Sequence, residues 1–334
     1  MRNRRLALVL SFLLLPALLL SGCVARPLQG ELAQSAAGDA LVIDLPAITI
    51  EYNEEGQANV EGLDLSALGI DLAALNRSPE DIQTLTAGGI QHVFVNLTPA
   101  GISLYANGKQ LPSLEWTPET LGSVGTVLGL VAPDNAETVG KLLPLASNVS
   151  LGIVMRFPAG GQELPLIVEP NRAALQAAQQ QAFQAAIAEL GLPPLVVPII
   201  QNPPPLTIQY ADDGSFQLLG LAPFITAAIP ADALAGLKLP ADQIDTLQEA
   251  GIESINLKTA PDGLTVAING TALPTLTWDS GEIENLISVG VDGGVLKALA
   301  GVDDELLGTI KGVGDFAPIL QAARLDITLS VPAQ

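Results

Sequence analysis

The sequence predicts an α+β fold made of two tandem homologous repeats, because one long segment occurs twice. Residues 82–116 match residues 244–278 without a gap at an offset of 162, and 13 of the 35 positions are identical. The identical positions include glycine, proline, Asn-Gly and tryptophan residues in register, which chance similarity rarely preserves. Since the offset is far longer than the ~20 to 50 residues of solenoid repeats, the match indicates a duplicated domain.

Alternating strands and hairpins at the start of each copy are the second observation. Residues 48–52 and 206–210 alternate apolar and polar side chains, and each segment runs into an acidic turn that ends at glycine. This pattern predicts two short antiparallel strands. A helix is expected next, over 79–87 and 241–250, with Ser78 as the N-cap of the first one.

Three more strands and a second helical region are expected to complete each copy. In the first copy the strands are predicted near 90–97, 101–106 and 110–116. The last two are joined by Asn107-Gly108, and Asn-Gly is favoured in type I′ hairpin turns because both central residues need a positive φ.

The chain then turns helical after each tryptophan, and a final strand closes each copy. In the second copy Asp279 and Glu282 have the spacing of a helix capping box. The closing strands are predicted over 149–157 and 325–331. We therefore expect each repeat to be an antiparallel sheet of short strands and hairpins packed with helices.

An Ala/Gln-rich helix and a Pro-rich linker are predicted to join the repeats. The helix covers 171–190 and carries a narrow apolar stripe, so it should lie against another part of the protein. The prolines that follow exclude a helix and favour extended chain. The predicted divisions are a signal segment, a lipidated tether, a first repeat, the connector and a second repeat, at 1–22, 23–40, 41–169, 170–205 and 206–334.

The N-terminal segment has the features of a secretion signal that ends at a cysteine. Arg2, Arg4 and Arg5 precede an apolar run, Leu6 to Leu20, and Leu20-Ser21-Gly22-Cys23 follows. The run is short for a permanent transmembrane helix, which needs roughly 20 residues. The segment resembles the signal peptides of bacterial lipoproteins. That resemblance implies cleavage after Gly22, a diacylglycerol on Cys23, and an extracytoplasmic protein anchored to the cell membrane, or to an outer membrane where the host has one.

The charge of the chain excludes several partners. The formal net charge is −21, and removal of residues 1–22 takes away three arginines and no acid, which brings it to −24. Such a field repels nucleic acid and anionic lipid headgroups. The membrane is therefore the expected partner only through the lipid on Cys23, and the sequence identifies no protein partner.

The residues of the mature chain predict neither an enzyme nor a metal or cofactor site. Cys23 is the only cysteine, so the exported domain has no thiolate ligand and no disulfide. His92 is the only histidine, is replaced by Ser254 in the second copy, and is interpreted as a half-buried or exposed non-catalytic residue. Gly312 and Gly314 fit part of a dinucleotide-binding pattern, but no βαβ unit can follow, so they indicate a loop.

The helices after the tryptophans suggest a hydrophobic ligand site. No residue between Glu119 and Asp134 is charged, and glycines thin this helix. Such a segment needs apolar surroundings, which could be a solid core, a ligand cavity or a membrane-inserted hairpin. For the cavity we name eight candidate lining residues: Leu121, Val124, Gly125, Leu128, Val131, Ile283, Leu286 and Ile287.

The expected function is the binding of a lipid or another hydrophobic small molecule. The layout of two linked α+β halves resembles, without a shared motif, the tubular and half-barrel folds of lipid-binding lipoproteins, and that resemblance implies a carrier. The alternative is a non-catalytic structural or interaction protein of the cell envelope, whose apolar helices are only core.

Overall fold

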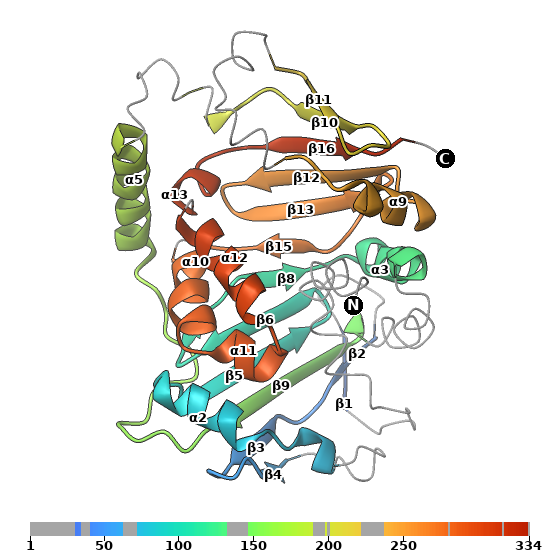
Figure 1. Ribbon diagram of the computed structural model, residues 1–334. Coiled ribbons are helices and arrows are strands. Elements are labelled where there is room, and N and C mark those ends of the chain that lie inside the picture. The colour runs from blue at the N-terminus through green and yellow to red at the C-terminus, as the bar shows by residue number, and fades with distance from the viewer. Residues whose placement is uncertain are drawn as a thin grey trace.

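The computed structural model describes residues 31–34, 41–62, 72–131, 146–189, 198, 201–221, 237–279, 281–315 and 317–332. The expected signal segment and Cys23 lie outside these residues, as does most of the Pro-rich linker. Within them the α+β class is confirmed, because helices pack on one large sheet (Figure 1).

The first half of the chain contributes strands, two short helical segments and one longer helix. Two strands at the N-terminal end pair with each other. In chain order the elements are β1 (Glu31–Gln34), β2 (Leu41–Asp44), β3 (Ile48–Tyr52), β4 (Ala58–Glu61), η2 (Leu72–Leu75), α2 (Pro79–Ala87), β5 (His92–Thr98), β6 (Gly101–Ala106), β7 (Lys109–Gln110), β8 (Ser113–Glu115), α3 (Pro118–Val131) and β9 (Val149–Arg156).

The second half follows a long connecting helix, α5 (Arg172–Glu189). Its strands and first helix come in the same order as those of the first half, and its later helical region is longer and broken into several pieces. The elements are β10 (Leu206–Tyr210), β11 (Phe216–Leu219), α9 (Ala241–Glu249), β12 (Ser254–Ala260), β13 (Gly263–Ile268), β14 (Thr271–Ala272), β15 (Thr275–Thr277), α10 (Glu282–Asn285), the π-helical turn η4 (Leu286–Val291), α11 (Val295–Ala300), α12 (Asp304–Asp315), α13 (Ala317–Leu320) and β16 (Asp326–Ser330).

Local turn chemistry explains why these elements form where the sequence predicts them. Ser78 is the N-cap of α2, and its hydroxyl accepts from the backbone N–H of Asp81, whose carboxylate accepts in return. Asn107 and Asn269 both have φ 50° at the tips of their hairpins. The side chain of Asn107 also accepts from the backbone N–H of Gln91 at 2.8 Å, and Asn269 accepts from that of Glu253 at 2.8 Å.

The two tryptophans make the same anchoring hydrogen bond. The indole N–H of Trp116 donates to the carbonyl of Pro99 at 2.9 Å, and that of Trp278 donates to the carbonyl of Pro261 at 2.9 Å. Both side chains are buried. A buried indole needs such a partner, so each tryptophan fixes the start of its helical region against the preceding hairpin.

The prediction of purely antiparallel sheets is wrong, because the closing strands pair in parallel with the opening ones. Ile48 on β3 lies opposite Ile153 on β9, and Leu206 on β10 lies opposite Ile327 on β16, both in parallel register. Each closing strand also pairs antiparallel with β5 or β12. Parallel neighbours require a long crossover, and the helical region of each half supplies it.

The halves join through the short strands β8 and β15. These strands pair antiparallel, with Leu114 opposite Leu276 and Ser113 opposite Thr277. The hydroxyl of Thr277 also donates to the carboxylate of Glu115 at 3.1 Å. The sheet is therefore continuous across the molecule, in the order β1-β2-β9-β5-β6-β8-β15-β13-β12-β16-β10-β11.

Each half of the sheet is covered by a helix from the other half. Val127 on α3 belongs to the core of the second half, with Ile244 and Leu247 of α9. Val289 on η4 belongs to the core of the first half, with Ile82 and Leu85 of α2. Figure 1 shows α11 beside α2, and α3 contacts β14 of the second half. The two cores depend on each other through this exchange.

The capping box expected at Asp279 and Glu282 forms only in part, because the carboxylate of Glu282 accepts a hydrogen bond from the backbone of Asp279 but α10 begins at Glu282 itself. The N-cap of α10 is Gly281, in the left-handed region at φ 91°, and no side chain caps the helix. The backbone N–H of Glu282 instead donates to the carbonyl of Asp279 at 3.1 Å. The side chain of Glu282 is buried.

Candidate functional site

The residues expected to line a cavity are distributed over several core clusters. Leu121 packs in the core of the first half, and Val124 in that of the second. Ile283 packs with Trp278 and Ala317. The structure therefore places the described members of the first helix and those of the second in separate surroundings.

The remaining candidates are placed as follows. Leu286 is partly buried on a cluster formed by Leu296 and its neighbours. The side chain of Ile287 occupies the space that a Cβ on Gly314 would take. Gly125 is half-buried. The side chains of Leu128 and Val131 lie outside the described part of the structure.

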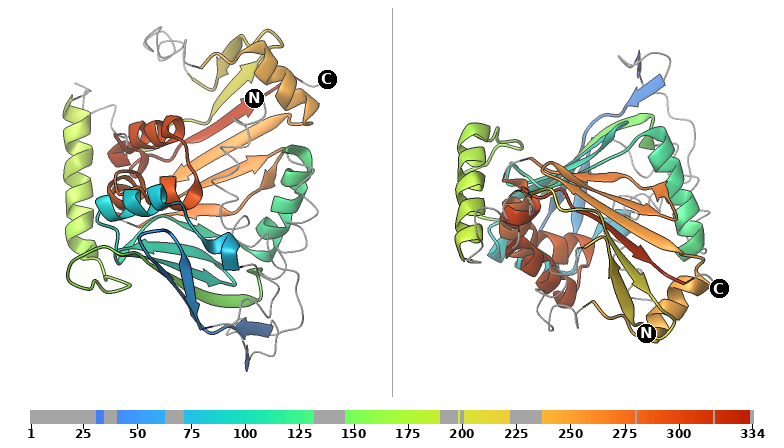
Figure 2. Two further views of the ribbon diagram at one scale, coloured as in Figure 1. Left: turned by 60° about the horizontal axis from the view of Figure 1, so that its bottom comes forward. Right: turned by 90° about the horizontal axis from the view of Figure 1, so that it is seen from above.

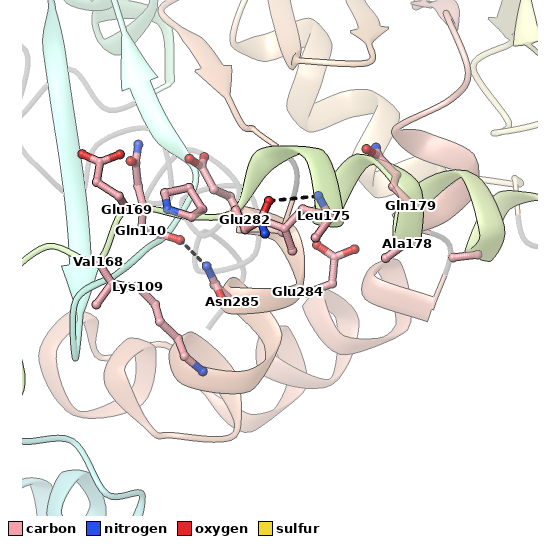
Figure 3. Close-up of a pocket in the computed structure, with 15 residues that line it drawn as sticks. Lys109, Gln110, Val168, Glu169, Leu175, Ala178, Gln179, Glu282, Glu284 and Asn285 are labelled. Carbon is pink, nitrogen blue, oxygen red and sulfur yellow. Dashed lines mark hydrogen bonds between the residues drawn. The ribbon is translucent and has the colours of Figure 1, made fainter.

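A pocket of about 610 Å³ lies between the connecting helix and the second-half helices (Figure 3). Its walls are α5, α10, β7 and the chain that leads into α5. Ligand pockets are typically of this size. The lining residues are Lys109, Gln110, Val168, Glu169, Pro170, Asn171, Ala174, Leu175, Ala178, Gln179, Ala182, Gly281, Glu282, Glu284 and Asn285.

The helix α5 forms the outer wall and is held at two places. Its Phe183 and Ile187 are buried, and the helix lies against α13. At its start, the guanidinium of Arg172 forms an ion pair with Asp279 at 3.0 Å. Both views of Figure 2 show α5 on the outer side of the helices that follow β15. The expectation that this helix lies against another part of the protein is confirmed.

Small side chains on α5 leave the pocket open. Ala174, Ala178 and Ala182 recur every four residues, so they share one face of the helix. Leu175 packs against Gly281 and closes the wall there. A Cβ added to Gly281 would lie only 3.1 Å from a methyl group of Leu175. This pocket was not predicted, because α5 was interpreted only as a connector between the repeats. The four-residue spacing of its alanines was a signal for a pocket wall.

Glu282 is the buried charged group of the pocket, with 8% of the residue exposed. Burial raises the pKa of its carboxyl to about 7, and the negative charges of Asp279 and Glu115 also raise it. A hydrogen bond to the backbone of Asp279 and the positive charge of Arg172 lower it. Among the described residues no lysine or arginine forms an ion pair with this carboxyl.

Asn285 fixes α10 against the edge of the first half. Its side-chain N–H donates to the carbonyl of Gln110 on β7 at 2.9 Å (Figure 3). Figure 3 also shows Glu169 and Gln110 toward one end of the pocket and Gln179 toward the other. One end of the pocket is therefore polar and acidic, while the alanine face of α5 lines the rest.

His92 is buried in the sheet and does not line the pocket. It is 2% exposed, which is more buried than expected, because β5 lies inside the sheet between β9 and β6. Burial lowers the pKa of its imidazole, and the charge of Arg156 adds to that effect. A neutral, buried imidazole outside the pocket is a core residue.

The described residues include neither a metal-binding cluster nor a membrane-spanning helix. They hold no group of three or more His, Cys, Asp or Glu side chains placed to bind a metal ion. None of the described helices combines the length and the apolar character needed to cross a bilayer.

Three comparisons of the chain with known proteins gave no match. No protein-family model matches it, and neither a curated protein nor a solved structure is significantly similar to it. The pocket is therefore interpreted from its own geometry.

Proposed function

We propose that the mature protein is a lipid-anchored extracytoplasmic binding protein that holds a hydrophobic or amphipathic ligand without transforming it. The observation that carries the proposal is the pocket of about 610 Å³ between α5 and α10, with its alanine face. The proposed anchor is the lipid on Cys23. The proposed ligand site is not the cavity that the sequence suggested; it lies between α10 and α5.

We further propose that the two halves are tandem homologous repeats. The matched hairpin asparagines and tryptophan anchors support this, as does the pairing of Leu114 with Leu276, which are equivalent positions at the offset of 162. Equivalent residues meet in this way across a twofold axis. The connector α5 occurs once, and it borders the pocket at only one of the two corresponding corners.

The anchor is tested by replacing the lipidated thiol. Cys23→Ser should leave an unlipidated precursor that retains residues 1–22, because lipid transfer needs the thiol. Metabolic labelling with a fatty acid and the mass of the product measure this. Label in the Cys23→Ser protein would contradict the lipoprotein assignment.

The ligand site is tested by filling the pocket. Ala178→Leu enlarges a side chain that lines the pocket, whereas Ala177→Leu makes the same change at a neighbouring position of α5 that does not line it; both alanines are exposed, so they differ in this respect only. Native mass spectrometry of the mature chain, residues 24–334, should show a co-purified hydrophobic molecule in the parent and in Ala177→Leu, and much less in Ala178→Leu. Equal occupancy of both variants would contradict the proposed site.

A role as an envelope interaction protein is the second candidate, because apolar side chains gather on one exposed loop. Leu164, Ile167 and Val168 are among the most exposed large hydrophobic residues of the described chain. Exposed apolar patches often mark contact sites. If the parent protein carries no ligand and Ile167→Ser abolishes cross-linking to envelope proteins in intact cells, this second function replaces the first.

A further inference from the structure

The pocket joins an apolar wall to a buried carboxylate, and this combination limits what it can bind. The alanine face from Ala174 to Ala182 is about 12 Å long, because a helix rises 1.5 Å per residue. That length corresponds to about ten bonds of an extended chain. The wall can therefore cover an alkyl chain of medium length, or an equivalent apolar body.

The charges around the pocket favour a cation. Three carboxyl groups line it, from Glu169, Glu282 and Glu284, against the single ammonium group of Lys109. Glu169, Glu284 and Lys109 are exposed to solvent, so water screens them, whereas Glu282 is buried. A buried carboxylate is costly unless a positive charge or several hydrogen bonds compensate for it.

Within the described part of the chain no cation pairs directly with Glu282, whose carboxylate accepts a hydrogen bond from the backbone of Asp279. Arg172 is the cation whose field acts on Glu282, but its guanidinium forms an ion pair with Asp279 at 3.0 Å and is largely exposed. Glu282 itself forms no ion pair within the described chain. A ligand that placed an ammonium or guanidinium group against Glu282 would complete a pair that the empty pocket lacks.

The other half of the molecule shows that these acidic groups are not a requirement of the fold. At the offset of 162, Glu282 corresponds to Thr120 and Glu284 to Gly122. There α3 lies on β14 as α10 lies on β7. Neither of these two positions carries a carboxyl group in α3, whose first turn has Glu119 instead.

We infer that the ligand is an amphipathic cation, with an apolar part along the alanine face of α5 and an amine or guanidine on Glu282. This inference rests on the proposed ligand-binding function and adds the chemical class. A fatty acid would place its carboxylate against three carboxyl groups, so it is the class that the pocket rejects.

Calorimetric titration of the mature chain, residues 24–334, with three probes of equal length tests the inference. This chain contains every residue that the structure describes. At pH 8 we expect decylamine to bind at least about tenfold more tightly than decanol, because a charge-assisted pair forms only with the amine, and decanoate to bind most weakly. As the pH falls through about 7, the carboxyl of Glu282 takes up a proton and the preference for decylamine should decline.

Glu282→Gln keeps the shape of the side chain and removes its charge. It should abolish the preference for decylamine over decanol, whereas Glu249→Gln, on the exposed face of α9, should leave that preference unchanged. Thermal unfolding of both variants confirms that they are folded. If decanol binds but decylamine shows no preference, or the preference survives in Glu282→Gln, the inference is wrong and the proposed function stands. If none of the three probes binds the parent protein, the proposed function fails and the inference fails with it.

Discussion

Two corners of the molecule are built alike and differ in one feature. In one corner α10 lies on β7, and in the other α3 lies on β14. The first is bordered by α5 and contains the pocket, with Glu282 and Asn285 on its inner side. The second has Thr120 and Ser123 at the corresponding positions. The two corners thus differ in that α5 borders only the first one. They also differ in the polar side chains at the corresponding positions, which are Glu282 and Asn285 in the first corner.

The largest effect is expected from a charge placed in an exchanged helix. Val127→Asp should lower the free energy of unfolding by about 4 kcal/mol or more, because it buries a carboxylate without a partner. Val289→Asp should do the same. Hydrogen exchange should show the first loss of protection in β12 and β13 for Val127→Asp, and in β5 and β6 for Val289→Asp, since each helix covers the opposite half.

Thr126→Asp is the matched control, because Thr126 is exposed on the same helix. It should change the stability by less than about 0.5 kcal/mol. If both valine variants lost protection in the same half, the exchange of helices would be wrong.

Ionisation of Glu282 should produce a pH dependence that the other corner lacks. The pKa of this carboxyl is raised from 4.5 to about 7 in the folded protein, so the native state holds a proton that the unfolded chain has already released. Its contribution to stability is therefore complete below about pH 4.5 and is lost as the pH rises to about 7 and above. Between those values the free energy of unfolding of Glu282→Gln should rise relative to the parent by about 2 to 3 kcal/mol.

Urea unfolding at pH 4.5 and pH 7.5 measures this difference, with Glu249→Gln as the control. The difference in the free energy of unfolding between Glu249→Gln and the parent should be the same at both pH values. A Glu282→Gln protein whose stability also follows that of the parent at both pH values would show that the carboxyl is not perturbed.

Gly88 should tolerate substitution less well than its counterpart, Ala250. A Cβ on Gly88 would collide with the carbonyl oxygen of Gly293, where α2 approaches the start of α11. We expect Gly88→Ala to cost about 2 kcal/mol of stability, in the range of overpacked cores. Ala250→Gly should cost less than about 1 kcal/mol. Thermal unfolding of the two variants compares the two positions directly. Equal losses of stability would contradict the close approach of Gly88 to Gly293.

The smallest effect concerns the hydrogen bond between α10 and β7. Asn285→Ala removes the donor to the carbonyl of Gln110 and should cost about 1 kcal/mol. Ser123→Ala, at the equivalent position, removes only a bond to the carbonyl of Glu119 within α3 and should be nearly neutral. Chemical denaturation resolves this difference, and a neutral Asn285→Ala would show that the bond does not hold the corner.

Sequence reasoning succeeded where the controlling interaction is local. Asn107 and Asn269 adopt positive φ at their hairpins, and Ser78 caps α2, because each depends on residues a few positions away. It failed for β9 and β16. Their parallel pairing depends on where a crossover of more than thirty residues returns to the sheet, which no local pattern encodes.

The candidate site was missed for the same reason. Glu282 has the spacing of a capping residue, and only the arrival of α5 turns its surroundings into a pocket. The alanines of α5 indicate a helix face with small side chains, but they do not indicate which part of the protein lies opposite that face. The suggested cavity helices are apolar because each enters the core of the opposite half, as Val127 shows.

The sequence by itself determined the α+β class, the hairpins, the connecting helix and the strong negative charge. Periodicity, turn residues and composition act over short distances or add up along the chain, so they can be read without coordinates. Only the tertiary structure decided that β8 and β15 join the sheet, that the helices cross to opposite halves, and that Glu282 is buried beside α5. These features depend on which surfaces meet after the chain has folded, because pairing of edges and burial of charge are set by partners more than a hundred residues away.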